Sequence, residues 1–208
     1  MKKMNFILVL TFLFSFSLIQ AQQEEDNSKF EIIAYGGIGY TKVKTHVQPR
    51  YDLNVNTGEI LLNYKVWGKY GIATGIGFSE LSGSGFNETG VFYSERNLLK
   101  IPLLFTLNQN ISDKLFILGT LGAYGQTPTK DQLAYIDGGE SDVYEGWNYG
   151  IQLGFGFGYN IDKKLGLGIN LNGQSDLSEL ETSSGKSFND KQKHNNLNSI
   201  GLFLKYKL

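Results

Sequence analysis

Bulky apolar residues alternate with small or polar residues along most of this chain, with a period of two. The clearest run extends from Trp147 to Tyr159, where apolar or aromatic side chains at every odd position are separated by Asn, Gln and Gly. With 41% hydrophobic residues in the chain, chance produces such a strict run on the order of once in 10⁴ windows. The segment is therefore predicted to be a β-strand.

The two faces of this strand differ in an unusual way. One face is bulky and apolar, and the other consists of Gly, Asn and Gln. A soluble sandwich fills its buried face with branched residues and exposes charge. The composition here favours a narrow barrel, with the small polar face inside and the bulky face presented to lipid.

Seven further segments repeat the alternation, which brings the predicted strands to eight. The eight predicted strands span 30–40, 59–66, 70–78, 99–107, 115–124, 147–159, 165–172 and 199–208. Long polar connections at 42–58, 79–92, 126–145 and 173–195 alternate strictly with short turns at 67–69, 108–114 and 160–164. This order predicts an all-β, eight-stranded antiparallel up-and-down transmembrane β-barrel in an outer membrane. Both termini are expected in the periplasm, and the four long loops outside the cell.

The first 21 residues have the layout of a secretory signal peptide. Lys2 and Lys3 precede an apolar run from Phe6 to Ile19, and Ala21 supplies a small residue at the cleavage point. The run is shorter than the roughly 20 apolar residues that span a bilayer as a helix. We expect removal of residues 1–21, a short periplasmic segment at 22–28, and a barrel domain over 29–208.

The last predicted strand carries a second targeting feature. Gly201, Leu204 and Tyr206 match the glycine, apolar and aromatic positions of the signal that barrel-insertion machinery reads on a final strand. The usual pattern ends on the aromatic residue, whereas this chain continues to Leu208. Outer-membrane lipid and the insertion machinery are thus expected partners.

The parity of the strands assigns side chains to the two faces of the barrel. We expect a polar network in the lumen, in which Glu31 and Glu59 meet some of the lysines, because charges at that depth are costly unless paired. The predicted network comprises Glu31, Glu59, Asn63, Lys65, Lys100, Gln152, Asn170 and Lys205. The predicted lipid-facing residues are Ile151, Leu153, Phe155, Phe157, Ile200, Leu202 and Leu204.

Composition argues against several kinds of chemistry. The chain has no cysteine, and its net charge of −1 does not suit a nucleic-acid binder. His46 and His194 both fall in predicted external loops and are interpreted as solvated. The acidic run at 137–142 lacks the ordered ligand spacing of a calcium loop. No catalytic residue, cofactor or metal site is expected.

The segment 97–104, with its Leu-Lys-Ile-Pro-Leu-Leu stretch at 99–104, resembles the PorT-like outer-membrane β-barrel family of Bacteroidota, a group of small barrels of the OmpX/OmpA type. The resemblance covers the chain from about residue 30 onward. It implies an outer-membrane barrel. Because the namesake members assist a secretion system while most relatives have no assigned role, it implies secretion assistance only as one alternative.

Three functions stay open at this stage. The first is a monomeric structural or interaction protein, without catalysis, whose surface loops or periplasmic rim bind another protein in secretion or adhesion. The second is a narrow gated channel for ions or small solutes. The third is a soluble periplasmic, lipocalin-like binder of a small apolar ligand, which would need the bulky residues to point inward.

Overall fold

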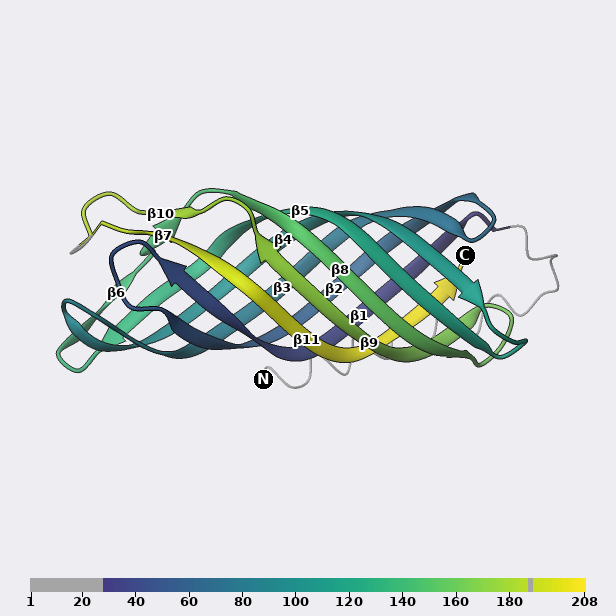
Figure 1. Cartoon of the computed structure of the whole chain (residues 1–208), viewed down its shortest axis with the longest axis horizontal. Helices are drawn as coiled ribbons and strands as arrows, with labels where there is room; N and C mark the ends of the chain where they lie inside the picture. The colour runs from purple at the N-terminus through teal and green to yellow at the C-terminus, as the bar shows by residue number, and fades with distance from the viewer. Residues whose placement is uncertain (1–27, 187–188) are drawn as a thin grey trace, which may run out of the picture.

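The protein folds as a long cylinder of antiparallel β-strands, seen from the side in Figure 1. The structure is a computed structural model that describes residues 28–186 and 189–208. The predicted signal peptide and nearly all of the segment at 22–28 lie outside the described residues. Within the described part of the chain, no helix is long and apolar enough to cross a membrane.

In the described part of the chain, eleven strands make up the sheet. They are β1 (Phe30–Thr45), β2 (Tyr51–Trp67), β3 (Tyr70–Asn87), β4 (Gly90–Asn110), β5 (Leu115–Tyr135), β6 (Gly138–Ser141), β7 (Tyr144–Glu145), β8 (Asn148–Asn160), β9 (Leu165–Asp176), β10 (Leu180–Thr182) and β11 (Lys191–Lys207).

Eight of these strands form a closed ring. The order is β1-β2-β3-β4-β5-β8-β9-β11, and β11 pairs back with β1. The closing pair is antiparallel, with Glu31 opposite Lys207 and Ile38 opposite Ile200. The predicted fold class, an eight-stranded antiparallel up-and-down barrel, is confirmed. Closure satisfies the backbone groups that an open sheet would leave unpaired at its two edges.

The two ends of the cylinder differ. At one end, here called the turn end, short turns at 68–69, 111–114 and 161–164 connect the strands. At the other, here called the extended end, β1 to β5 and β11 run well beyond β8 and β9, and the short strands β6, β7 and β10 lie there (Figure 1). Strands of up to 21 residues greatly exceed the roughly 9–11 residues that cross a bilayer.

The pattern of inside and outside residues inverts along the cylinder. Near the turn end of β2, Ile60 and Leu62 point outward and Glu59 points inward. Toward the extended end, Asp52 points outward and Leu53 inward. The outer surface thus changes from apolar to polar, while the interior changes from mixed polar and apolar layers to a mainly apolar core.

This inversion corrects the predicted loops at 42–58, 79–92, 126–145 and 173–195. Most of 42–58 and 79–92 is strand, and the connections shrink to 46–50 and 88–89. Much of 126–145 and 173–195 is also strand, including β6, β7 and β10. The alternation with a period of two continues through these segments. The apolar residues there occupy the inward positions, where they form a hydrophobic core, and the outward positions are mostly polar.

Two short strands complete the wall of the extended end where β8 and β9 have stopped. β10 pairs with β11, and β7 pairs with β10. The amide of Tyr144 on β7 donates to Oδ2 of Asp131 on β5 at 2.9 Å. The extended end therefore continues the wall of the cylinder and is not a set of separate loops.

Glycine permits the close approach of β11 to β1. A Cβ placed on Gly201 would lie 2.1 Å from the carbonyl oxygen of Gly36 and 2.5 Å from Cα of Gly37. Both are backbone atoms of β1, so they cannot move aside without opening the closing pair. A Cβ on Gly36 would meet nothing within 4 Å.

We expect Gly201→Ala to lower the free energy of unfolding by about 1–3 kcal/mol, the usual cost of overpacking. Gly36→Ala, in the same strand pair, should change it by less than about 0.5 kcal/mol. Urea titration of barrels refolded in detergent or lipid measures both. Equal effects of the two substitutions would contradict the close approach at Gly201.

Candidate functional site

The interior of the barrel is filled by alternating polar and apolar layers. An apolar cluster near the turn end includes Ile33, Leu104, Phe116 and Phe203, whose rings at 116 and 203 meet edge to face at 5.8 Å between centroids. A larger apolar cluster fills the extended end, with Leu53, Leu81, Phe92 and Leu133 among its members. Charged groups lie between and beside these clusters.

An ion pair crosses the middle of the barrel. Lys100 on β4 donates to Glu59 on β2 and, at 3.0 Å, to Oε1 of Gln152 on β8. The Gln152 amide also donates to Glu59 Oε2 at 3.2 Å. Lys100 is only 1% exposed. Gly77 on the intervening strand β3 makes this contact possible, because a Cβ there would lie 3.0 Å from Lys100 and 3.1 Å from Glu59.

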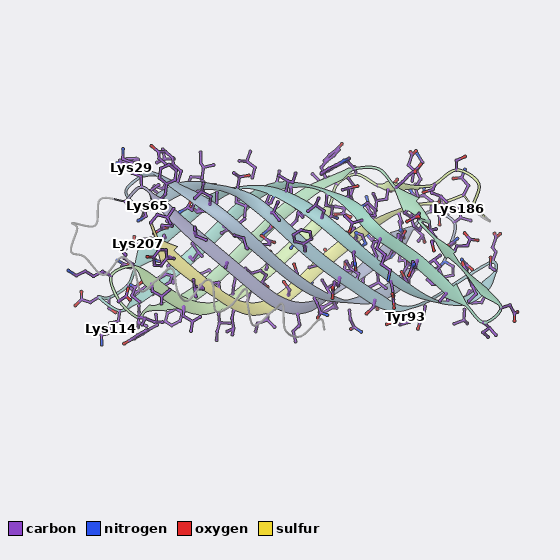
Figure 2. The ribbon with its side chains drawn as sticks, turned by 180° about the vertical axis from the view of Figure 1, so that it is seen from behind. Lys29, Lys65, Tyr93, Lys114, Lys186 and Lys207 are labelled. Atoms are coloured by element: carbon purple, nitrogen blue, oxygen red, sulfur yellow. The ribbon has the colours of Figure 1, made fainter. Side chains whose placement is uncertain are left out.

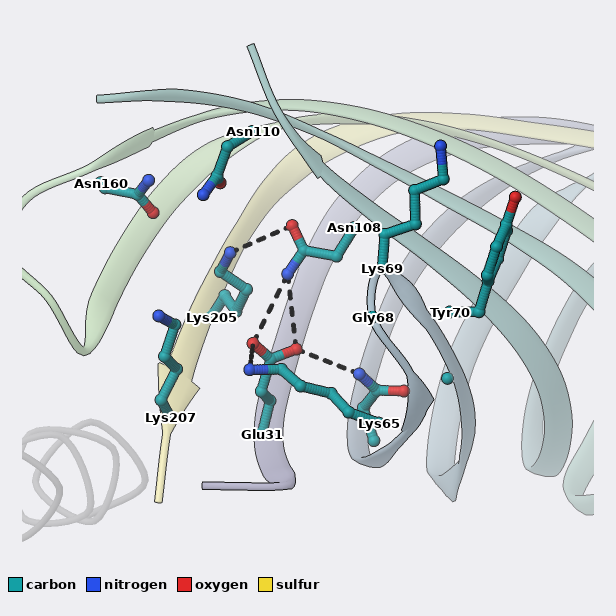
Figure 3. Close-up of a pocket in the computed structure, with 12 residues that line it drawn as sticks. Glu31, Lys65, Gly68, Lys69, Tyr70, Asn108, Asn110, Asn160, Lys205 and Lys207 are labelled. Carbon is teal, nitrogen blue, oxygen red and sulfur yellow. Dashed lines mark hydrogen bonds and ion pairs between the residues drawn. The ribbon is translucent and has the colours of Figure 1, made fainter. Parts of the chain in front are cut away.

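A second polar group lies inside the turn end (Figure 3). Glu31, fully buried, accepts from Lys65 Nζ at 2.9 Å and from the Asn63 amide at 3.0 Å. The Asn108 amide contacts the same carboxylate at 3.4 Å, and its oxygen accepts from Lys205 Nζ at 3.3 Å. A cavity of about 150 Å³ opens beside these residues.

Seven of the eight residues of the predicted lumen network thus lie in two separate groups. Glu59, Lys100 and Gln152 form the middle one, and Glu31, Asn63, Lys65 and Lys205 belong to the one at the turn end. Asn170 is buried on β9 but joins neither, and its side-chain oxygen has no hydrogen-bond partner. Lys65 is a quarter exposed, because it lies at the mouth of the barrel.

A third buried network, at the base of the extended end, was missed by the sequence analysis. Arg96 on β4 makes a bidentate contact with Asp131 on β5, at 3.0 Å and 3.1 Å from Nη2 to the two carboxylate oxygens. Both side chains are buried. Arg96 Nη1 also lies 3.1 Å from Nε2 of His194.

His194 corrects the interpretation of both histidines as solvated. It is 2% exposed and lies on β11, and its Nδ1 is 3.0 Å from Oδ2 of Asp176. Because arginine can only donate, Nε2 must accept from Arg96, which places the histidine proton on Nδ1 and directs it to Asp176. His46 does lie in a connection, exposed and 2.9 Å from Glu179.

Asp176 is held by donors from three further directions. Its carboxylate accepts from Tyr124 Oη at 2.6 Å, from the Gln126 amide at 3.0 Å and from the Asn148 amide at 2.7 Å. This saturated, enclosed arrangement suits a structural role. Among residues 28–186 and 189–208, no cluster of three or more His, Asp or Glu residues could hold a metal ion.

Tyr51 lies buried inside the extended end. Burial raises the pKa of its hydroxyl to about 12, although the nearby positive charge of Arg96 acts in the opposite direction. Gln192 lies between the two: with its oxygen toward Arg96 Nη1 at 2.7 Å, its nitrogen donates to Tyr51 Oη at 3.0 Å. The phenol therefore stays neutral at physiological pH.

A signal for the missed residues was present in the sequence. Phe92, Ser94 and Arg96 have the same parity as Leu98 and Lys100, so they continue the inward face of β4. The outward residues Glu95 and Asn97 are polar, which ended the predicted strand too early.

The residues predicted to face lipid all point outward and are well exposed on the cylinder. Leu153 and Leu202 are both 61% exposed, and Leu204, the least exposed of the set, is 39% exposed. The others are Ile151, Phe155, Phe157 and Ile200. Of the predicted insertion signal, Leu204 and Tyr206 lie on the outer face of β11, while Gly201 lies at its contact with β1.

The fold is similar to those of solved outer-membrane barrels. Neisserial surface protein A matches with a TM-score of 0.54 and 10% identity, over 87% of this chain and 98% of that one. Outer membrane protein OprG from Pseudomonas aeruginosa has a TM-score of 0.50 and 13% identity, over 87% and 98%. Outer membrane protease OmpT from Escherichia coli has a TM-score of 0.52 and 10% identity, over 91% and 99%.

At such low identity the likeness shows the fold alone. No protein-family model matches the chain, and no curated protein matches it. The resemblance of residues 97–104 to the PorT-like family therefore stays a prediction. What the structure and the comparisons establish together is a barrel with the architecture of outer-membrane proteins.

The middle ion pair gives a direct test of the interior. Lys100→Met leaves the Glu59 carboxylate buried without its cation, which should cost about 3–5 kcal/mol of unfolding free energy. Combining it with Glu59→Leu should recover most of that loss, because no charge is then left unpaired. Urea titrations of the two single variants and the double variant measure this. Additive losses would contradict the pairing.

Proposed function

We propose that this chain is an integral outer-membrane protein with a structural or interaction role, and that it is neither a channel nor an enzyme. The turn end faces the periplasm in this proposal, and the extended end stands outside the cell. The observation that carries the proposal is the filled interior, in which buried ion pairs and two apolar clusters occupy the lumen.

The outer surface supports insertion in a membrane. Aromatic residues border the apolar band at both levels, as interfacial girdles do. Phe30 and Tyr159 lie at the turn end, with 44% and 45% of their surfaces exposed. Tyr40 and Trp147 lie at the border of the apolar band nearer the extended end, and are 54% and 58% exposed. The same arrangement disfavours the lipocalin-like alternative, which needs the bulky residues inside.

The interior argues against conduction. An eight-stranded barrel is only just wide enough for its own side chains. Here Lys100, Glu59 and Gln152 bridge three strands across the lumen, and Arg96, Asp131 and His194 form a second buried layer. An ion would have to break both layers to pass.

A non-catalytic role fits the placement of the ionisable groups. His194 and Asp176 are both buried, at 2% and 3% exposure. The neighbours named above occupy their hydrogen-bonding positions and do not form an open site. A substrate arriving from either end would not reach this pair.

The tip of the extended end offers a surface for another protein. Phe86 and Val91 are cross-strand partners on the outer face of the β3–β4 hairpin, 55% and 61% exposed. Tyr93 lies below them opposite Ala134, and Ile136 follows in the next connection with 93% exposure. These residues lie beyond the polar outer band, so lipid does not cover them. Apolar surface of this kind in water marks protein contacts.

Conductance tests the closed lumen. We expect no single-channel currents from the wild type in planar bilayers, and none from Lys100→Met, because the second ionic layer stays in place. Insertion is verified beforehand by heat-modifiable migration on gels. Discrete openings in the wild type would support the channel instead.

Site-specific photo-crosslinking tests the interaction role. A photoreactive residue at position 86 in native cells should yield a discrete adduct with another protein, whereas one at the outward position Asn56, in the polar band, should not. Adducts at neither position, or equally at both, would count against a contact at the tip.

A further inference from the structure

A row of positive charges crosses the outer face of the extended end. Lys44 on β1 lies directly opposite Lys193 on β11, in the pair of strands that closes the barrel. On the other side of β1, Tyr51 is the partner of Val43, so the same register continued by one residue sets Arg50 beside Lys44. These three cations, from three neighbouring segments of the wall, are called the basic row here.

The basic row points away from the lumen. Val43 and His194, which face each other across the closing pair, are 0% and 2% exposed. Their neighbours Lys44 and Lys193 therefore lie on the outer face, because successive side chains of a strand point to opposite faces. Arg50 is exposed as well.

The charges of the basic row are not neutralised by the residues that the structure describes. Among those residues, Lys44, Lys193 and Arg50 make no ion pair, side-chain hydrogen bond or ring contact. Lys42, one outward position nearer the turn end, is not counted in the row because its register partner is Asp52.

The acidic residues of the adjoining segments have other partners. Glu179 contacts His46 at 2.9 Å, and Glu181 pairs with Lys191. The carboxylate of Asp190 accepts from three backbone amides of the β1–β2 connection. These contacts hold together the connections beside the basic row, and they engage the carboxylates that could otherwise turn toward it.

Such a row is unfavourable on its own. Like charges directly opposite on neighbouring strands destabilise a sheet, and their Cβ atoms are only about 4.5–5.5 Å apart. Salt screens charges that are separated by more than a Debye length, about 8 Å at physiological ionic strength, so this pair is only partly screened. An anion that contacts both Lys44 and Lys193 would replace the repulsion by attraction.

The basic row lies just beyond the apolar band. Tyr40 borders the band on β1 with 54% exposure, and Lys44 follows four residues later, which is roughly 13 Å along a strand. Because barrel strands tilt by about 35–45°, the rise along the axis is smaller, about 10 Å. Lysine stems can also lie along the wall and return their ammonium groups toward the headgroup level. The row is therefore within reach of lipid phosphates.

The basic row is separate from the lysines of the turn end. Figure 2 shows four of those lysines at the end opposite to Tyr93 and Lys186: Lys29, Lys65, Lys114 and Lys207. Lys114 there lies over the ring of Tyr159, with its Nζ 5.8 Å from the ring centre. A lysine with such a partner is less available to an anion than the lysines of the basic row.

We propose that the basic row binds the phosphate of an anionic lipid headgroup at the rim of the membrane. Lys44 and Lys193 hold this phosphate from two strands as point charges, and Arg50 can donate two parallel hydrogen bonds to it. Basic clusters next to a membrane recognise anionic headgroups in this way. That the leaflet is the outer one rests on the proposed function, whereas the phosphate chemistry does not.

The test is native mass spectrometry of the folded full chain, released from micelles that contain a diacyl phosphatidate or a phosphatidylcholine with the same acyl chains. We expect one phosphatidate to stay bound at concentrations at which phosphatidylcholine does not. Lys44→Gln combined with Lys193→Gln should weaken this binding about ten-fold. The matched control, Lys130→Gln with Lys163→Gln, removes the same charge from exposed lysines elsewhere and should leave the binding nearly unchanged. Heat-modifiable migration verifies the folding of each variant.

Urea unfolding gives a second readout. In phosphatidylcholine micelles the Lys44→Gln, Lys193→Gln variant should unfold at a urea concentration equal to or above that of the wild type, because the repulsion is gone. Phosphatidate should raise the midpoint of the wild type, as a ligand of the folded state does. It should leave the midpoint of this variant unchanged.

Three results would overturn the proposal. They are equal retention of the two lipids, equal weakening in both variant pairs, and complete displacement of phosphatidate by equimolar inorganic phosphate, which would assign the basic row to a free anion. A chain that inserts, stays silent in bilayers and crosslinks at position 86, yet retains no phosphatidate, would refute the lipid site and leave the proposed function standing.

Discussion

The pairing of β11 with β1 is the constraint on which the rest of this structure depends. Without it, the sheet would present two long rows of unpaired amides and carbonyls, and in hydrocarbon each such group costs several kcal/mol. Closure needs the backbones to approach within van der Waals contact at Gly201. It also creates the narrow lumen in which inward charges such as Glu59 and Lys100 are paired between strands.

The outer face of the cylinder is apolar toward the turn end, as suits lipid, and polar toward the extended end, as suits water, and the side chains of the lumen change with it. Where the outer face is apolar, the lumen holds paired charges, amides and a small apolar cluster around Leu104 and Phe116. Where the outer face is polar, the lumen becomes a larger hydrophobic core around Leu53 and Phe92. The ionic layer of Arg96, Asp131 and His194 lies at the transition. These buried layers support the proposal that the barrel has no open path and acts through its ends.

The period of two was enough to predict the ring of eight strands, because outside and inside residues differ most where lipid is the solvent. The prediction failed at 42–58 and 79–92. The alternation continues there, but the outward positions are polar, so the sequence alone predicts polar loops. Parity also placed Glu59 and Lys100 inside, but their pairing depends on the register of β2, β3 and β4 and on the gap left by Gly77. His194 shows the same limit: nothing local in sequence reveals that Arg96, 98 residues earlier, is its neighbour.

Labelling of single cysteines along β2 tests the central claim most directly, since the chain has no cysteine of its own. In liposomes, brominated lipids should quench a fluorophore at positions 60, 62 and 64, and a water-soluble thiol reagent should modify positions 52, 54 and 56. Water-soluble modification of 60–64, with quenching at 52–56 or nowhere, would contradict a barrel that crosses lipid at its turn end and stands in water beyond it.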